Sequence, residues 1–154
     1  ADEALAPFIS PPARLLDFGS GPVPVFADLM RARGYSVEIY DPLFAPGFPG
    51  SEGRYDAITA VEVAEHLFAP GKEFARLRDV LRPGGVLALR TLLHYGDRER
   101  FASWWYRRDP THVCFYSRRS FETLAELLGM ELVSVVNGRS VVMRRVIDRR
   151  IEAW

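Results

Sequence analysis

The segment from Leu15 to Pro42 constrains the fold of this chain more than any other stretch. A short apolar run ends at Gly19-Ser20-Gly21, and the following residues carry apolar side chains at helical spacing. Residues 36–40 then alternate between apolar and polar side chains and lead to Asp41-Pro42. A strand, a glycine turn, a helix and a second strand in this order predict the first unit of a doubly wound α/β sheet.

Further apolar runs predict that the same architecture continues to the end of the chain. Strands are expected at residues 55–61 and 86–91, and helices at 62–68, 70–81 and 120–128. Asn137-Gly138 lies between two more apolar runs and predicts an antiparallel hairpin, because Asn-Gly favours the type I′ turn. We therefore expect one α/β domain over 1–154, with a Rossmann-like, mostly parallel sheet over 14–147 and a partial N-terminal cap over 1–13.

Composition argues against several classes of partner. The chain has 154 residues, 48% of them apolar, which suits a single hydrophobic core. Its 20 basic and 20 acidic residues cancel, so no net charge attracts nucleic acid. Cys114 is the single cysteine, no stretch approaches the roughly 18 apolar residues of a membrane span, and the first residues do not resemble a signal peptide. We expect a cytoplasmic protein with a small-molecule partner, no nucleic acid and no membrane span.

The glycine turn itself distinguishes between two kinds of nucleotide ligand. A dinucleotide fingerprint starting at Gly19 needs Gly or Ala at position 24, where this chain has Pro24. Asp17, just before the turn, would repel a pyrophosphate and suits a cationic or hydroxyl-bearing ligand. The sequence therefore disfavours a nicotinamide cofactor.

Four motifs in this order resemble the class I S-adenosylmethionine-dependent methyltransferases. They are Asp17-Phe18-Gly19-Ser20-Gly21, Asp41 after the second strand, "YDAITAVEVAEHL" and "LRPGGVLALRT". The chain is most similar to the branch that includes ubiquinone-biosynthesis O-methyltransferases, over residues 15 to 146. The resemblance implies an enzyme that uses S-adenosylmethionine, releases S-adenosylhomocysteine and methylates a small molecule, with a hydroxyl as the expected acceptor group.

The resemblance also implies roles for individual residues. Gly19 and Gly21 would let the backbone approach the methionine part of the cofactor, and Asp41 would accept hydrogen bonds from the ribose hydroxyls. Asp17 would orient the loop or meet the ammonium group. The full set implied for the cofactor is Asp17, Gly19, Ser20, Gly21, Asp41, Pro42 and Glu62. A plain strand-to-helix turn, and an Asp-Pro turn at Asp41, are the structural alternatives.

One departure from the family pattern concerns the segment after Asp41. Family members often have a helix, a strand and a helix there, whereas this chain has only residues 42–54 before the next strand. We therefore expect one edge strand to be shortened or missing and the loop from Leu43 to Phe48 to contact the adenine. An exposed sheet edge would favour a homodimer.

The acceptor is expected to bind near the aromatic segment from Trp104 to Phe121. His112 is the candidate catalytic base or acceptor-orienting group, because histidine titrates near neutral pH. An aromatic or lipid-like acceptor would contact Tyr95, Trp105, Tyr106 and Tyr116. The alternative is that His112 and these aromatic residues only pack a lid against the sheet.

A metal site is the open question in "VEVAEHL". Glu62, Glu65 and His66 are spaced so that one helix would bring them to a common point, and in some ubiquinone-type relatives the matching residues are associated with a divalent metal. Acidic residues in a first helical turn also simply suit the helix dipole. We expect no metal.

The same motifs argue against methylation of nucleic acids. Enzymes that methylate nucleic-acid amino groups would show an Asn/Asp-Pro-Pro-aromatic motif after the third strand, where this chain has Val61-Glu62-Val63-Ala64. A cytosine-carbon enzyme would use a Pro-Cys nucleophile, but Val113 precedes Cys114. A methyltransferase-like binding or scaffold protein without turnover stays as the alternative. The sequence does not identify the acceptor.

Overall fold

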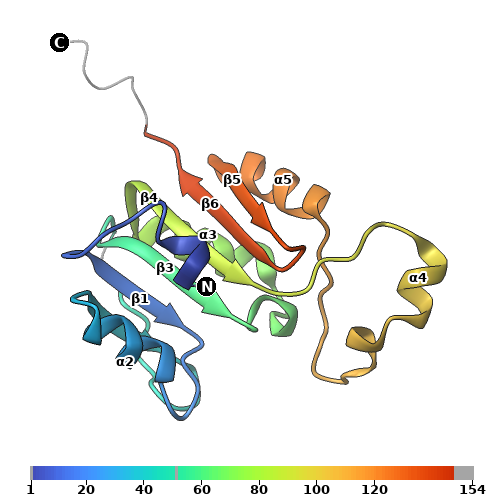
Figure 1. Cartoon of the computed structure of the whole chain (residues 1–154), viewed down its shortest axis with the longest axis horizontal. Helices are drawn as coiled ribbons and strands as arrows, with labels where there is room; N and C mark the ends of the chain where they lie inside the picture. The colour runs from blue at the N-terminus through green and yellow to red at the C-terminus, as the bar shows by residue number, and fades with distance from the viewer. Residues whose placement is uncertain (1, 51, 148–154) are drawn as a thin grey trace.

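A six-stranded sheet in the order β2-β1-β3-β4-β6-β5 forms the centre of the computed structural model, which describes residues 2–50 and 52–147 (Figure 1). The first four strands are parallel, and β6 runs antiparallel to both β4 and β5. This arrangement confirms the predicted Rossmann-like sheet with its C-terminal hairpin. The strands are β1 (Arg14–Phe18), β2 (Ser36–Tyr40), β3 (Tyr55–Val61), β4 (Leu81–Arg90), β5 (Met130–Val136) and β6 (Ser140–Arg145).

Helices cover both faces of the sheet. The elements α1 and α2 lie on one face, and α3 and α5 lie on the other (Figure 1). The bounds are α1 (Asp2–Leu5), α2 (Val25–Ala32), α3 (Pro70–Val80), α4 (Arg98–Ser103) and α5 (Arg118–Leu127), with 3-10 helices η1 (Ala64–His66) and η2 (Trp105–Arg108). No helix within the described residues is long and apolar enough to cross a membrane.

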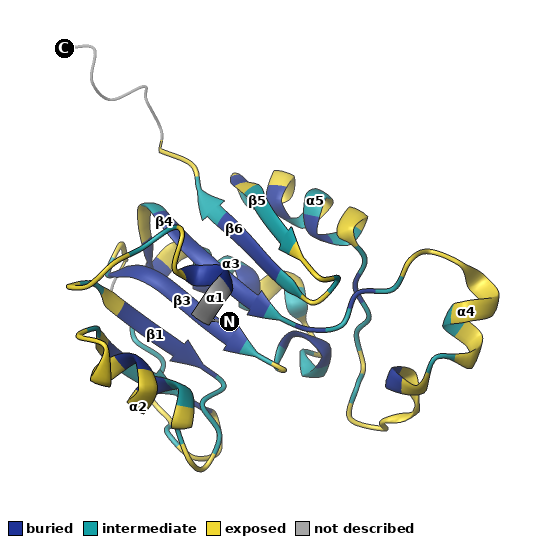
Figure 2. Cartoon of the chain, in the orientation of Figure 1, coloured by how far each residue is buried: buried dark blue, intermediate teal, exposed yellow. Residues whose placement is uncertain are grey.

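Side chains along the central strands point alternately to the two faces of the sheet and form two apolar layers. Leu15 packs with Ala27 and Met30 of α2, whereas its neighbour Leu16 packs in the layer that holds Phe74 of α3. Figure 2 shows β3 and β4 buried along most of their length. Successive side chains of a strand point to opposite faces, so one buried strand contributes to both layers. The sheet is therefore rigid where its carboxyl ends hold the loops described below.

The hairpin follows the predicted turn chemistry. Asn137 and Gly138 have φ angles of 52° and 61°, and Val136 pairs with Ser140 across the turn. A type I′ turn requires positive φ at both central positions, which Asn and Gly adopt at low cost. The last strand of the hairpin, β6, can therefore pair with β4 and extend the sheet.

The strand β2 lies at one edge of the sheet, as expected from the short segment after Asp41. In place of a helix, the loop 42–50 packs Phe48 against the sheet. The Phe48 ring lies 5.2 Å from the Tyr40 ring and 6.4 Å from the Phe18 ring, with both pairs edge to face. One aromatic side chain thus covers part of the face that a helix would otherwise cover.

Three elements differ from the sequence prediction. The strand β4 begins at Leu81 rather than Val86, and its register with β3 is irregular between Tyr55 and Ala57. Gly85 lies in this irregular part, where a Cβ would be 3.1 Å from backbone oxygens of Tyr55 and Asp56. The helix expected at 62–68 is reduced to η1. The connection 94–115, for which no helix was predicted, contains α4 and η2 and extends to one side of the sheet (Figure 1).

Candidate functional site

The glycine turn after β1 is held against the end of β2. The backbone N–H groups of Gly19 and Ser20 donate to the carbonyl of Tyr40 at 2.7 and 3.2 Å. Gly19 and Gly21 have φ angles of 77° and 67°. A Cβ at Gly19 would lie 3.2 Å from Cγ1 of Val63 and closer still to Cγ2, whereas a Cβ at Gly21 would meet nothing within 4 Å. Glycine is therefore required at position 19 by both conformation and space.

Asp41 connects this turn to the next loop. Its carboxylate is 8% exposed and accepts hydrogen bonds from the backbone N–H groups of Gly21 (3.0 Å), Leu43 (2.9 Å) and Phe44 (3.2 Å). A carboxylate offers about four acceptor positions, so roughly one stays available to a ligand. The Asp-Pro turn weighed as an alternative is thus present, and the same side chain also borders the cavity described next.

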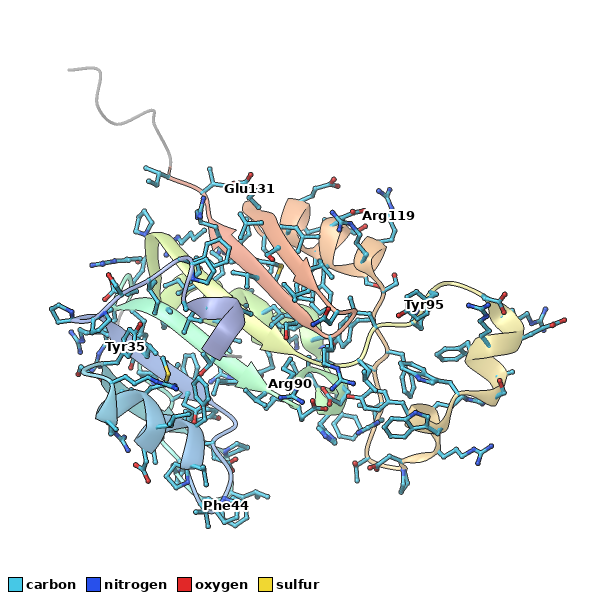
Figure 3. The ribbon with its side chains drawn as sticks, in the orientation of Figure 1. Tyr35, Phe44, Arg90, Tyr95, Arg119 and Glu131 are labelled. Carbon is cyan, nitrogen blue, oxygen red and sulfur yellow. The ribbon has the colours of Figure 1, made fainter. Side chains whose placement is uncertain are left out.

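A cavity of about 780 Å³ opens between the glycine turn, the loop after Asp41 and the segment after β3. Leu43, Phe44 and Phe68 line it and are 81%, 57% and 90% exposed, so its rim is apolar (Figure 3 labels Phe44). Its lining residues are Phe18, Gly19, Tyr40, Asp41, Pro42, Leu43, Phe44, Glu62, Val63, His66, Leu67, Phe68, Ala69, Glu73, Arg76 and Thr111. This size and mixed lining suit a nucleoside-sized ligand.

Four of the seven residues that the resemblance implies for the cofactor line this cavity: Gly19, Asp41, Pro42 and Glu62. The other three, Asp17, Ser20 and Gly21, lie in or next to the turn without lining it. Only part of the loop 43–48, which was expected to contact the adenine, borders the cavity. Leu43 and Phe44 line the cavity, whereas Phe48 packs on the core.

Asp17 is buried behind the turn. It is 3% exposed, and Oγ1 of Thr59 donates to its Oδ1 at 3.2 Å. Burial raises the pKa of Asp17 from 3.8 to about 6, and the hydrogen bond from Thr59 and the charge of Arg31 oppose that rise. A buried carboxylate with so few partners is stabilised by any cation that comes near.

The raised pKa of Asp17 predicts the effect of Asp17→Asn. Between pH 3.8 and about 6 the folded state holds a proton that the unfolded state has lost, so the stability contributed by this group falls as pH rises through that window. Asparagine does not ionise, so the variant does not lose stability in this pH window. At pH 7.5 the variant should gain on the order of 2 kcal/mol of unfolding free energy, measured by urea denaturation.

A matched comparison is available at lower pH. Near pH 4 the variant and the wild type should differ little, because most of the wild-type carboxyl is then protonated in the folded state. Asp28→Asn, at an exposed residue paired with Arg31 at 2.8 Å, should give no such gain at either pH. A loss of stability at pH 7.5 in Asp17→Asn would contradict the account.

A second group of polar residues surrounds the hydroxyl of Tyr106. This hydroxyl donates to Oε1 of Glu65, lies 3.2 Å from Oε2 of Glu62 and lies 3.3 Å from Oγ1 of Thr91. Glu65 is fully buried, and Arg90 forms an ion pair with Glu62 at 3.3 Å (Figure 3 labels Arg90). Burial, followed by the adjacent Glu65 carboxyl, raises the pKa of Glu62. The Glu62 carboxyl is therefore protonated more readily than that of an exposed glutamate.

Two imidazoles lie on the other side of Glu65. Nδ1 of His66 donates to the carbonyl of Thr111 at 3.0 Å, and Nδ1 of His112 donates to the carbonyl of Tyr106 at 2.7 Å. Their ring centroids are 4.9 Å apart. With Nδ1 donating in both rings, Nε2 is the ring nitrogen that faces other partners, and in His112 it lies 3.7 Å from Oδ2 of Asp109.

Glu65, His66 and His112 offer one ligand atom each, and these atoms all lie within 4.8 Å of one another. Oε2 of Glu65 is buried and has no hydrogen-bond partner among the residues the structure describes. Two imidazoles whose other nitrogen donates to a backbone carbonyl, with one carboxylate, form a donor set that suits a divalent cation. The expectation that no metal is needed stays a prediction.

This cluster differs from the set Glu62, Glu65 and His66 that the sequence spacing suggests for a metal. Glu62 has a φ of 54° and lies before η1, where it contacts Arg90 and Tyr106 instead of joining a helical face. His112 is brought in because the backbone N–H groups of Val113 and Cys114 both donate to the carbonyl of Glu65, at 2.8 and 3.0 Å. Sequence spacing alone gave no signal for this contact.

The aromatic residues expected to bind the acceptor do not line the large cavity. Tyr116 is 7% exposed, stacks on Phe121 at 4.9 Å and donates its hydroxyl to the carbonyl of Ala64 at 2.9 Å, so it anchors the lid segment in the core. Tyr106 is also buried. Trp105 and Tyr95 are 65% and 83% exposed. For Tyr116, the structure agrees with the alternative role, in which the side chain only packs the lid against the sheet.

Sequence reasoning missed several residues that border the cavity. His66, Phe68, Arg76 and Thr111 line it, and of these only His66 and Thr111 belong to motifs that attracted attention. Arg76 reaches the site from α3 by stacking over the Phe48 ring, 4.0 Å from its centroid.

Comparison with known proteins agrees with this geometry. A family model described as a methyltransferase domain matches residues 2–135. No curated protein matches the chain in a sequence search.

Solved structures share the fold at low sequence identity. A Bacillus halodurans protein provisionally assigned as a methyltransferase is 13% identical, with a TM-score of 0.70 over 95% of this chain and 98% of that one. An S-adenosylmethionine-dependent methyltransferase, also provisionally assigned, from Methanococcus maripaludis is 15% identical, with a TM-score of 0.68 over 97% and 85%. Phosphoethanolamine N-methyltransferase 2 of Haemonchus contortus, in complex with phosphomonomethylethanolamine and S-adenosylhomocysteine, is 17% identical, with a TM-score of 0.64 over 84% and 37%.

Proposed function

Because the chain belongs to a methyltransferase domain family and is therefore an enzyme, we propose that it transfers the methyl group of S-adenosylmethionine to a hydroxyl of a small-molecule acceptor. One observation carries the proposal. The cavity of about 780 Å³ is lined by Gly19 and Asp41, which are expected to bind the cofactor, and also by Glu62 and His66. Residues suited to the cofactor and polar residues suited to the acceptor thus border the same space.

The cofactor would lie along the carboxyl ends of β1 and β3, where ligands of open α/β sheets bind. Its methionine part would pass over Gly19, and its ribose would use the remaining acceptor capacity of Asp41. Its adenine would lie between the exposed Leu43 and Phe44. The ammonium and sulfonium charges would approach buried Asp17. The Haemonchus contortus enzyme of similar fold is bound to S-adenosylhomocysteine, which supports this choice of cofactor.

His112 is proposed as the catalytic base or acceptor-orienting group, acting with His66 and Glu65. Methyl transfer requires the acceptor oxygen in line with the S–CH₃ bond, and a base assists by taking the hydroxyl proton. Nε2 of His112 can accept that proton, and the Asp109 carboxylate 3.7 Å away would stabilise the resulting imidazolium. The His112 side chain is 9% exposed, so the acceptor would reach it past His66, which lines the cavity.

A divalent cation is a second candidate at the same place, favoured by the unpartnered Oε2 of Glu65. Glu65, His66 and His112 would hold it, and the cation would bind the acceptor oxygen and lower the pKa of its hydroxyl. In that case His112 would act as a ligand rather than as a base. The two roles predict different responses to chelation.

The proposal is tested by calorimetric titration of the full chain with S-adenosylhomocysteine, with NAD as the control ligand. We expect micromolar binding of the former and none of the latter. A screen of phenols and alcohols with labelled S-adenosylmethionine should then give turnover that His112→Gln lowers by roughly 100-fold, the lower end for general-base catalysis. The thermal melt of the variant checks that it folds.

The outcomes separate the alternatives. If activity survives a strong chelator and is lost in His112→Gln, His112 acts as the base. If the chelator abolishes activity and added Mg²⁺ or Mn²⁺ restores it, the cluster holds a cation. A chain that binds neither S-adenosylhomocysteine nor S-adenosylmethionine would overturn the proposal. The alternative, a methyltransferase-like binding or scaffold protein without turnover, would then be favoured.

A further inference from the structure

Two charged residues that line the cofactor cavity have no role in the proposed function. The charged and imidazole side chains of the lining are Asp41, Glu62, His66, Glu73 and Arg76. Asp41 is assigned to the ribose, and Glu62 and His66 are assigned to the acceptor. Glu73 and Arg76 both belong to α3 and are not yet matched to any part of a ligand.

The Glu73 carboxylate is held in one position by Arg76. Nη1 of Arg76 donates to Oε2 of Glu73 at 2.7 Å, and the Glu73 side chain is 27% exposed. The Arg76 guanidinium in turn lies over the Phe48 ring, 4.0 Å from its centroid. The ion pair uses Oε2, so Oε1 of Glu73 can accept a hydrogen bond from a ligand.

This ion pair is connected to the strand end that carries the ribose acceptor. The Phe48 ring under Arg76 lies 5.2 Å from the ring of Tyr40, the last residue of β2, and Asp41 follows directly. Tyr40, Asp41 and Glu73 line the same cavity. A carboxylate of α3 therefore borders the space that receives the base attached to the ribose.

An adenine ring has a hydrogen-bonding edge as well as two faces. The proposed position of the adenine puts its faces against Leu43 and Phe44, and neither side chain offers a polar group to the edge. The 6-amino group on that edge is a hydrogen-bond donor, and a carboxylate is purely an acceptor. The other glutamate of the lining, Glu62, pairs with Arg90 at 3.3 Å after β3. Glu73 is thus the lining carboxylate best suited to this amino group.

We infer that Oε1 of Glu73 accepts a hydrogen bond from the 6-amino group of the cofactor's adenine, with Arg76 as the positioning residue. The inference rests on the proposed function, because it adds one contact to the cofactor named there. The same carboxylate would repel a purine that carries a carbonyl oxygen in place of the amino group. Glu73 therefore selects adenine among the purines.

The test is a calorimetric titration of the full chain with S-adenosylhomocysteine and with its purine analogue, in which hydrogen replaces the 6-amino group. We expect the wild type to bind the analogue about tenfold more weakly, the usual effect of losing one charge-assisted hydrogen bond. Glu73→Ala should weaken S-adenosylhomocysteine by about the same factor. The analogue should bind this variant and the wild type equally, because it lacks the group that Glu73 contacts.

The matched control is Glu122→Ala in α5. Glu122 also forms an ion pair along a helix, with Arg118 at 2.9 Å, and its side chain is 35% exposed, but it lies outside the cavity lining. This variant should keep the full preference for S-adenosylhomocysteine. Thermal melts check that both variants fold, and the comparison of the two ligands on the wild type depends on neither variant.

The inference is overturned if the wild type binds both ligands equally, or if Glu73→Ala keeps the wild-type preference. In the second case Glu73 and Arg76 only stabilise the surface of α3 as an i,i+3 pair. Both results leave the proposed function intact, since S-adenosylhomocysteine binds in each. A wild type that binds neither ligand overturns the proposed function and the inference together.

Discussion

Replacing Asp41 with alanine is expected to weaken S-adenosylhomocysteine binding by more than about 100-fold. The substitution removes a charged acceptor for the ribose hydroxyls, and hydrogen bonds to a charged group contribute about 1.5–3 kcal/mol each. It also removes the acceptor of three backbone N–H groups, those of Gly21, Leu43 and Phe44. The glycine turn and the cavity rim therefore both lose the hydrogen bonds that hold them to Asp41. Calorimetry of the variant against the wild type measures the loss.

Two further variants separate ligand contact from loop support. Asp41→Asn keeps one acceptor oxygen without the charge, so it should retain most of the thermal stability while still binding S-adenosylhomocysteine at least tenfold more weakly. Asp28→Ala, at an exposed residue of α2 outside the cavity lining, should bind like the wild type. Unchanged affinity in both Asp41 variants would show that Asp41 is only an Asp-Pro turn.

The second large effect is expected at Gly19. Gly19→Ala places a Cβ against Val63 in a backbone conformation with φ of 77°, so the variant should lose roughly 3 kcal/mol of unfolding free energy and all measurable cofactor binding. Val63 lies just before η1, so the displacement also reaches Glu62 and Ala64. Urea denaturation and calorimetry on the same preparations report both losses.

Gly21→Ala is the matched control for this prediction. Its φ of 67° imposes a similar backbone cost, but its Cβ would lie in open space, so we expect a loss of only about 1 kcal/mol. The difference between the two variants measures the contact with Val63. Equal losses would mean that backbone strain alone explains the effect.

The sequence was sufficient where a local pattern determines the structure. The glycine turn, the helix after it and the hairpin at Asn137-Gly138 each follow from φ preferences and periodicity within a few residues. The shortened edge next to β2 also followed, since residues 42–54 are too few for a helix, a strand and a helix. These elements position four of the seven expected cofactor residues around one cavity.

The sequence was insufficient where contacts join distant segments. His112 meets His66 and Glu65 because two backbone N–H groups dock on the carbonyl of Glu65, and no periodicity encodes that contact. Tyr116 is aromatic like Trp105, but one is in the core and the other is exposed, which residue type alone does not distinguish. The positive φ of Glu62, which turns it out of the helix, is likewise set by tertiary packing.

The two outer strands of the sheet have a consequence for handling the protein in solution. Within the described residues, β2 pairs only with β1 and β5 only with β6, so each end of the sheet has an edge without a partner strand, and the Val37 carbonyl of β2 accepts from the Arg31 guanidinium at 2.8 Å. A free edge allows two copies to pair through the same strand, and two different free edges also allow molecules to add one after another. Glu38, in the middle of β2 and paired with Arg14 and Arg54, places charge at one of these edges. Charge on an edge strand opposes fibril growth, and salt weakens that protection by screening, so concentrated stocks are best kept at low ionic strength.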